Sequence, residues 1–118
     1  MKMSTSIYKA NNKIEVEAVK DGSGDTCCTF VIHDEDHTLG NSLRYIISKN
    51  PDVEFCGYCI PHPAENKINL RIQTKGESAS NVLKKGLEDL HTVCEHMLNT
   101  FDKSINEFKN NERNNEHE

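Results

Sequence analysis

Tryptophan is absent from this sequence of 118 residues, and the other aromatic residues number only three tyrosines and four phenylalanines. Platforms that bind single-stranded nucleic acid stack its bases on aromatic side chains, so this scarcity argues against such a platform. Acidic residues outnumber basic ones, which gives a formal net charge of -5. Because a protein of that sign repels phosphate backbones, we expect no direct binding of nucleic acid as the main activity.

Long apolar runs are also missing. No stretch approaches the ~20 apolar residues of a membrane span, so we expect no contact with a membrane. The first six residues lack the apolar core of a secretory signal. Five cysteines, an odd number without a sign of secretion, predict reduced thiols in the cytosol or the nucleus.

The apolar residues that are present lie almost entirely between residues 13 and 109. A chain of this length supports one core rather than two. The sequence therefore predicts a single domain over residues 13–109, a flexible N-terminal segment at 1–12 and a disordered, asparagine-rich tail at 110–118.

Apolar and polar residues alternate in four short segments, which is typical of half-buried strands. We predict strands at 13–19, 26–33, 53–60 and 67–74. The first two are joined by a turn rich in glycine and aspartate, so they form a hairpin. Together with two helices, the pattern predicts an α+β fold: a four-stranded, mostly antiparallel sheet with a short helix and a long C-terminal helix.

The short helix is expected at residues 38–49, where apolar residues recur at helical spacing. Thr38 is the expected N-cap, and Pro51 disfavours helical geometry in the residue before it. After Gly76, an apolar stripe continues to Phe108 and predicts a second helix of ~28 residues, about 40 Å long.

A helix of that length extends beyond strands of about 25 Å. Its distal apolar residues would face water in a monomer, and apolar patches of this size mark interfaces. We therefore expect a partner chain to cover them. The alternative is that the helix breaks near Asn99-Thr100 and folds back on its own sheet.

Cys56 and Cys59 have the spacing of redox and zinc sites, with His62 three residues further on. Residues three apart on a strand point to opposite faces, so the two sulfurs would not converge without a bulge. We favour structural cysteines, with a thiol or zinc protein as the alternative. The adjacent Cys27 and Cys28, and Cys94 on the helix stripe, are interpreted as small apolar residues.

The acidic segment Asp34-Glu35-Asp36-His37 could be interpreted as a metal or acid-base cluster. Its consecutive side chains diverge, and acidic residues are favoured in any case before the start of a helix. No phosphate-binding loop, nucleophile elbow or zinc-protease motif is present. We expect no catalytic residues, no metal and no cofactor.

One extended set of motifs resembles a known family. It comprises His37-Thr38-Leu39-Gly40-Asn41-Ser42-Leu43-Arg44-Tyr45, Lys49-Asn50-Pro51-Asp52-Val53-Glu54-Phe55-Cys56-Gly57-Tyr58, Pro61-His62-Pro63 and Arg71-Ile72-Gln73-Thr74. These residues resemble the small alpha-like subunits of cellular RNA polymerases over residues 26–108. Within that family the chain is most similar to the subunit shared by RNA polymerases I and III, with the RNA polymerase II paralogue as the alternative.

The resemblance implies the fold of the bacterial alpha-subunit dimerisation domain and a non-catalytic function in the nucleus, both nucleolus and nucleoplasm. Such subunits pair with a larger alpha-like subunit, and the heterodimer is the platform for the two catalytic large subunits. The contact is expected on both helices. The implied interface positions are Leu39, Gly40, Leu43, Ile46, Ile47, Leu83, Leu87, Leu90, Cys94, Met97, Phe101 and Phe108.

The remaining motif residues are implied to act around that interface. His37, Thr38, Gly40 and Asn41 are expected to shape the start of the short helix, and Arg44 to reach a polar group at the rim. Motif residues expected to contact a large subunit are Tyr58, Pro61, His62 and Pro63.

Overall fold

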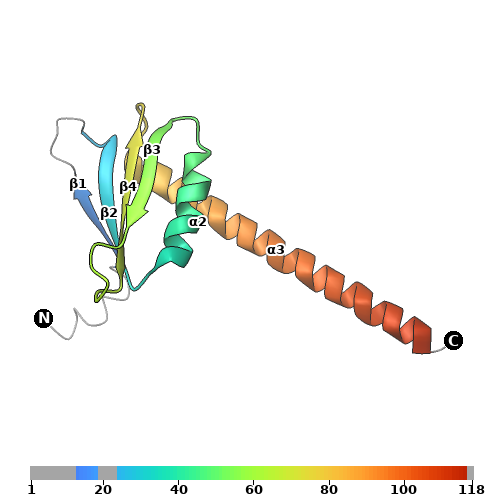
Figure 1. Ribbon diagram of the computed structural model, residues 1–118. Helices are drawn as coiled ribbons and strands as arrows, with labels where there is room; N and C mark the ends of the chain where they lie inside the picture. The colour runs from blue at the N-terminus through green and yellow to red at the C-terminus, as the bar shows by residue number, and fades with distance from the viewer. Residues whose placement is uncertain (1–12, 19–23, 117–118) are drawn as a thin grey trace, which may run out of the picture.

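A computed structural model describes residues 13–18 and 24–116, and it has the predicted α+β class (Figure 1). The strands are β1 (Ile14–Ala18), β2 (Cys27–His33), β3 (Val53–Cys59) and β4 (Lys67–Thr74), and the helices are α2 (His37–Ser48) and α3 (Ala79–Glu116). Each strand and α2 begin and end within one residue of the predicted positions. The predicted segment 1–12 lies outside the described residues.

The four strands form one antiparallel sheet in the order β1-β2-β4-β3. Phe30 pairs with Leu70 and Ile32 with Ile68 across the two central strands, and all four side chains are at most 1% exposed. Both helices pack on this one face of the sheet, so a single core lies between sheet and helices. The alternation that predicted the strands is the alternation between this core and the opposite face.

The register of β3 differs from the expected pattern. A bulge between Val53 and Phe55 inserts one residue, so Val53, Cys56 and Tyr58 pack toward the core. Phe55 and Cys59 are exposed and lie on the other face. The simple alternation predicted Val53 and Phe55 on the same face, and the extra residue makes that prediction wrong.

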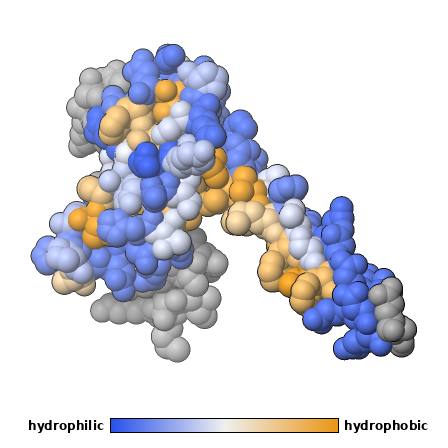
Figure 2. Space-filling view, turned by 45° about the vertical axis from the view of Figure 1, so that its right-hand side comes forward, coloured by the Kyte–Doolittle hydropathy of each residue, from blue (hydrophilic) through white to orange (hydrophobic). Residues whose placement is uncertain are grey.

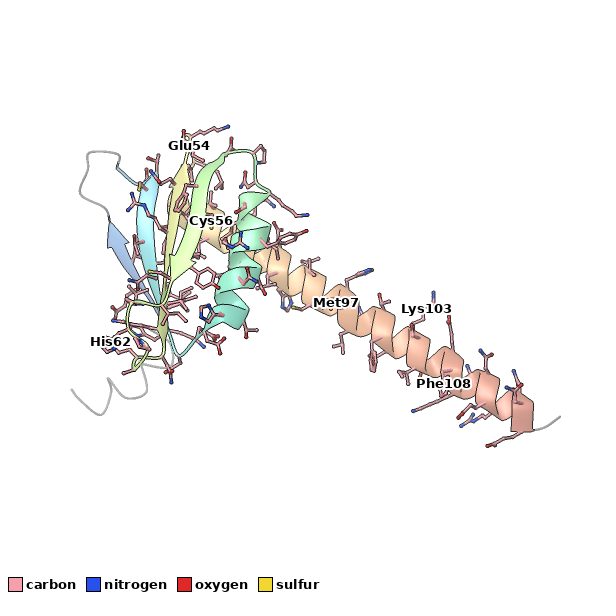
Figure 3. All side chains as sticks on the ribbon, in the orientation of Figure 1. Glu54, Cys56, His62, Met97, Lys103 and Phe108 are labelled. Atoms are coloured by element: carbon pink, nitrogen blue, oxygen red, sulfur yellow. The ribbon has the colours of Figure 1, made fainter. Side chains whose placement is uncertain are left out.

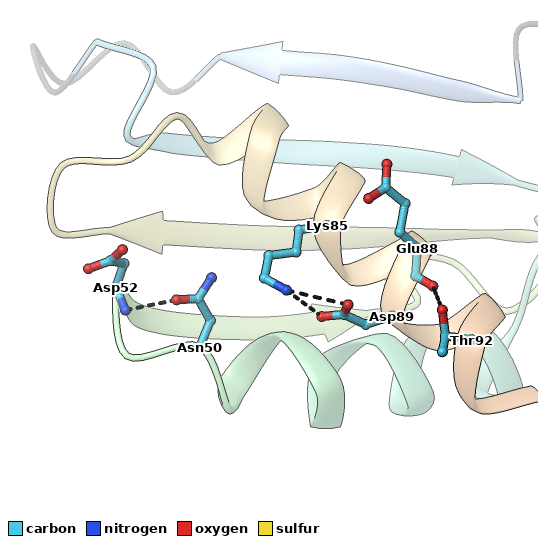
Figure 4. A network of polar contacts seen from close by, with 6 residues as sticks. All are labelled: Asn50, Asp52, Lys85, Glu88, Asp89 and Thr92. Atoms are coloured by element: carbon cyan, nitrogen blue, oxygen red, sulfur yellow. Dashed lines mark hydrogen bonds and ion pairs between the residues drawn. The ribbon is translucent and has the colours of Figure 1, made fainter. Parts of the chain in front are cut away.

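Helix α2 begins one residue earlier than predicted, which corrects its cap. Asp36, not Thr38, is the N-cap: its carboxylate accepts a hydrogen bond from the Thr38 backbone N–H at 2.9 Å. This hydrogen bond lowers the pKa of the Asp36 carboxyl. At the other end, the Asn50 side chain accepts a hydrogen bond from the Asp52 N–H and closes the turn that leads into β3 (Figure 4).

Two glycines allow α2 to lie close to its neighbours. A Cβ atom added at Gly40 would be 2.7 Å from Cδ2 of Tyr58 on β3. A Cβ atom added at Gly86 on α3 would be 2.6 Å from Cγ1 of Ile47. The space at either position is too small for a methyl group. Because glycine has no side chain, α2 can pack closely against both the sheet and α3.

Helix α3 has 38 residues, which corresponds to a length of about 57 Å. It therefore continues well beyond the predicted 28 residues, and residues 110–116 are helical rather than a disordered tail. It also runs unbroken through Asn99 and Thr100, so the folded-back alternative is wrong. The molecule consequently measures 72 × 42 × 25 Å, with α3 projecting from one side (Figure 1).

The proximal part of α3 alone contacts the domain. Ala79, Val82, Leu83 and Gly86 are buried under the sheet and α2, while Leu90 is only partly buried. From His91 to Ser104 every residue is exposed. Polar side chains form local contacts along the helix, such as Lys85 Nζ with the Asp89 carboxylate at 3.0 Å (Figure 4).

Candidate subunit interface

The projecting half of α3 carries large apolar side chains in contact with solvent. Met97, Leu98, Phe101 and Phe108 are each 60–64% exposed. Figure 3 shows Met97 and Phe108 on the part of the helix that lies beyond the sheet, and Figure 2 shows apolar surface along this part. An exposed apolar patch of this extent marks an interaction surface.

Three of these side chains, Met97, Phe101 and Phe108, belong to one narrow row. Leu90, Cys94, Met97, Phe101 and Phe108, which we call the seam, follow one another at spacings of three, four or seven residues. That is the spacing of a helix face that packs along a second helix. The row continues the face on which Leu83 and Leu87 meet the domain, so a second chain would enter the angle between the domain and the projecting helix.

A groove of about 470 Å³ adjoins the proximal end of the seam, between α2 and α3. Tyr45 and Ile46 of α2 lie on one side of it, and Leu90, Val93 and Met97 of α3 on the other. The Lys49 ammonium lies 4.5 Å from the centre of the Tyr45 ring, a cation-π contact. The seam and this groove together form one continuous, mainly apolar surface.

Several residues predicted at the interface lie in the chain's own core. Leu43, Ile47 and Leu83 are at most 5% exposed, and Gly40 is buried against Tyr58. Their contact with a partner stays a prediction, and the chain itself leaves little of these side chains accessible. Helical periodicity identified an apolar face, but their own sheet covers this part of it.

The other predicted interface residues remain accessible. Leu39, Ile46, Leu87 and Leu90 are partly buried, while Cys94, Met97, Phe101 and Phe108 are exposed. The predicted positions omit three exposed neighbours on the same surface, namely Tyr45, Val93 and Leu98. Val93 and Leu98 lie on the predicted apolar stripe, so the signal for them was present. Tyr45 carried no such signal, because it lies off the apolar face of α2.

Residues of the helix-start motif have structural contacts within the chain. His37 Nδ1 lies 2.9 Å from the Tyr58 hydroxyl, and the two rings meet edge to face. Arg44 donates a hydrogen bond to the Asn41 side chain at 2.8 Å. Tyr58 therefore supports α2 from beneath, through both its ring and its hydroxyl.

Comparison with known proteins agrees with this geometry. The family described as "RNA polymerase Rpb3/Rpb11 dimerisation domain" matches residues 27–100, which run from β2 into the seam. The chain belongs to this family.

Two curated relatives are more than half identical to the chain over the aligned residues. "DNA-directed RNA polymerases I and III subunit RPAC2" of Danio rerio is 58% identical over 93 residues, covering 78% of this chain and 83% of the relative. The Saccharomyces cerevisiae protein of the same name is 52% identical over 94 residues, covering 79% of this chain and 66% of the relative.

A solved structure has the same fold. The RNA polymerase subunit L of Thermoplasma acidophilum superposes with a TM-score of 0.65 at 19% identity, covering 81% of this chain and 93% of that one. The chain and that subunit therefore share one fold.

The cysteine pair has the geometry of structural residues. Cys56 lies opposite Ile72 and packs against the core, whereas Cys59 lies opposite Asn69 and is exposed on the other face. Burial raises the pKa of the Cys56 thiol to about 11, although the positive charge of Arg44 opposes the shift. The two sulfurs do not face a common metal, and a thiol with such a pKa is a poor nucleophile.

The described residues hold no group of three or more histidine, cysteine, aspartate or glutamate side chains that could bind a metal ion. The acidic segment before α2 is used instead by the Asp36 cap and by Glu35, which pairs with Lys13 at 2.5 Å. Within the described ranges, no helix is long and apolar enough to cross a bilayer. The loop with Pro61, His62 and Pro63 is exposed.

Proposed function

We propose that this chain is a non-catalytic assembly subunit of RNA polymerases I and III. It pairs with a larger alpha-like subunit, and the heterodimer is the platform on which the catalytic large subunits assemble. The observation that carries the proposal is the seam, an exposed apolar row on a domain of the Rpb3/Rpb11 dimerisation family. The names of its relatives supply the polymerase context.

The energetics support an obligate partner. Burying a large apolar side chain stabilises a complex by ~1.5–3 kcal/mol. Met97, Leu98, Phe101 and Phe108 together offer several times that amount, and none of them is covered by its own domain. A helix of the larger subunit placed along the seam, with its end in the groove beside Tyr45, would cover the whole surface.

The choice of polymerases I and III over polymerase II rests on the relatives. Those from fish, fly, two yeasts, an amoeba and two nematodes are all named as subunits of RNA polymerases I and III. With these enzymes as its partners, the chain would act in the nucleus, in both nucleolus and nucleoplasm.

Contact with a large subunit is proposed through the loop at Pro61, His62 and Pro63. This loop is exposed and lies at the end of the sheet, away from the projecting part of α3 (Figure 3). Two prolines stiffen it, and the His62 ring nitrogen accepts a hydrogen bond from the Ala64 N–H at 3.4 Å. Because the loop lies away from the seam, a large subunit can contact it while the larger alpha-like subunit occupies the seam.

Affinity purification of the tagged full chain from cells tests the proposal. Wild type should recover the larger alpha-like subunit and the large subunits of polymerases I and III. Phe101→Asp or Leu90→Asp should lose them all, because each variant places a charge in a dry interface. Lys103→Asp, on the opposite side of α3, is the matched control. Recovery of the wild-type chain alone, or with polymerase II large subunits, would contradict the proposal.

A further inference from the structure

The residues of the seam are arranged symmetrically about Asn99. Met97 and Phe101 lie two residues on either side of it, and Leu90 and Phe108 lie nine residues on either side. Two identical helices in antiparallel orientation bring such positions opposite each other, as the two-fold axis of a homodimer requires. We infer that α3 is complementary to itself, and that the isolated chain pairs with a second copy through antiparallel α3 helices centred near Asn99.

The pairs that result are chemically matched. Met97 meets Phe101 and Leu90 meets Phe108, each pair twice, while Leu98 lies beside its own copy near the centre. Cys94 meets Ser104, a polar residue on the same face of α3, and both of these side chains are small. Every large apolar residue of the seam is thus covered by another.

Charges at the edges of the row favour the same orientation. In a parallel pair, Glu107 of one helix would lie beside Glu112 of the other, at both edges. Like charges in that position are destabilising.

The shape of the molecule sets the ends of the contact. Toward its N-terminus α3 is covered by α2 as far as Gly86, so the accessible row starts near Leu90. In the antiparallel pair, Phe108 of the second copy reaches Leu90 at the groove of about 470 Å³. The polar residues that follow Phe108 then pass along the domain. A parallel pair would bring the two domains to the same end of the seam, where α2 already lies.

The area is sufficient for a specific contact. Five apolar side chains of each α3, from Val93 to Phe108, are 46–64% exposed. At roughly 100 Å² each, two copies bury about 1,000 Å², the lower limit of a specific interface.

This inference rests on the proposed function in one respect: the larger alpha-like subunit takes the same surface. Self-pairing then keeps the seam covered until that subunit is available. Assembly of the heterodimer must displace the second copy.

Cysteine cross-linking of the purified full chain tests the arrangement. The background variant is Cys59→Ser, which removes the exposed thiol of the sheet. Ser104→Cys then places a thiol opposite Cys94 of the second copy. These positions are ten residues apart on one helix, about 15 Å, so they cannot join within one chain. Mild oxidation followed by a non-reducing gel measures the product.

We expect a monomer band from the background variant and a covalent dimer once Ser104→Cys is added. Adding Cys94→Ser as well should abolish the dimer. A covalent dimer formed through Cys94 in the background variant would indicate a parallel pair and would overturn the inference. So would the absence of cross-linking with Ser104→Cys, or a chain that sediments as a monomer up to concentrations of 100 μM, on the order of a weak dissociation constant.

Adding the larger alpha-like subunit before oxidation separates the two proposals. Loss of the cross-link supports both self-pairing and displacement. A cross-link that survives an excess of the larger subunit leaves self-pairing intact and contradicts the proposed function. A monomeric chain that binds the larger subunit contradicts self-pairing alone.

Discussion

Replacing Phe101 with alanine should weaken subunit pairing and leave the fold of the chain unchanged. The side chain is 62% exposed, which for a phenylalanine of ~200 Å² leaves roughly 120 Å² available to a partner. At about 25 cal/mol per Å², covering that area stabilises the complex by about 3 kcal/mol. The dissociation constant of the heterodimer should therefore rise about 100-fold.

The assay is a titration of the larger alpha-like subunit into the chain, followed by calorimetry, with thermal unfolding of the same samples in parallel. Lys103→Ala is the control, because residue 103 lies on the opposite side of α3 and is exposed. The reasoning is refuted if Phe101→Ala binds like the control, or if it lowers the unfolding temperature of the chain at a concentration where the chain is monomeric.

Four further changes test the core, the helix packing and the titrating groups. Leu43→Ala removes a side chain with 0% exposure, so chemical unfolding at fixed protein concentration should show a loss of about 2–5 kcal/mol. Gly40→Ala should destabilise wild type because its Cβ meets Tyr58, yet stabilise a Tyr58→Ala background by about 1 kcal/mol through helix propensity; equal effects in both would refute the clash. At pH 8 iodoacetamide should alkylate Cys59 well before Cys56, whose pKa of about 11 leaves roughly one thiol in a thousand ionised; mass spectrometry would show the reverse order if Cys56 were activated. Hydrogen bonding to Thr38 holds the pKa of Asp36 below its ordinary value in the folded chain, so its stabilisation is present above pH ~4 and is lost as the pH falls. The advantage of wild type over Asp36→Asn should therefore shrink on acidification, and a gap that stays constant would contradict this.

Regular patterns explain which elements the sequence predicted well. Strand β4 alternates without interruption, and it lies between two other strands with one face on the core, so its ends match the prediction at both Lys67 and Thr74. The bulge in β3 was not predictable in this way, because the same residues in the same order also fit a regular strand.

The polar composition of residues 110–118 predicts disorder, so the predicted end of α3 comes too early. No glycine follows Gly86 and no proline follows Pro63, so residues 110–116 lack the two strongest helix breakers. Asparagine is a weaker helix former than alanine, but it costs less than glycine or proline, and the helix continues to Glu116.

The interface was half predictable. The apolar stripe of α3 indicated that a long helix needs a cover, and the exposed residues Met97, Phe101 and Phe108 agree with that. Periodicity does not distinguish a face covered by the chain's own sheet from one left open. Leu43 and Ile47 were therefore placed at the interface, although their position in the core depends on the close approach at Gly40 and Gly86.

The most direct test of the seam as a subunit interface is the mass of the complex in solution. The purified full chain and the larger alpha-like subunit are mixed in equal amounts and measured by light scattering after gel filtration. A single species with the mass of one copy of each is predicted for wild type, and separate species for Phe101→Asp. Separate species for wild type, or an intact complex with Phe101→Asp, would contradict it.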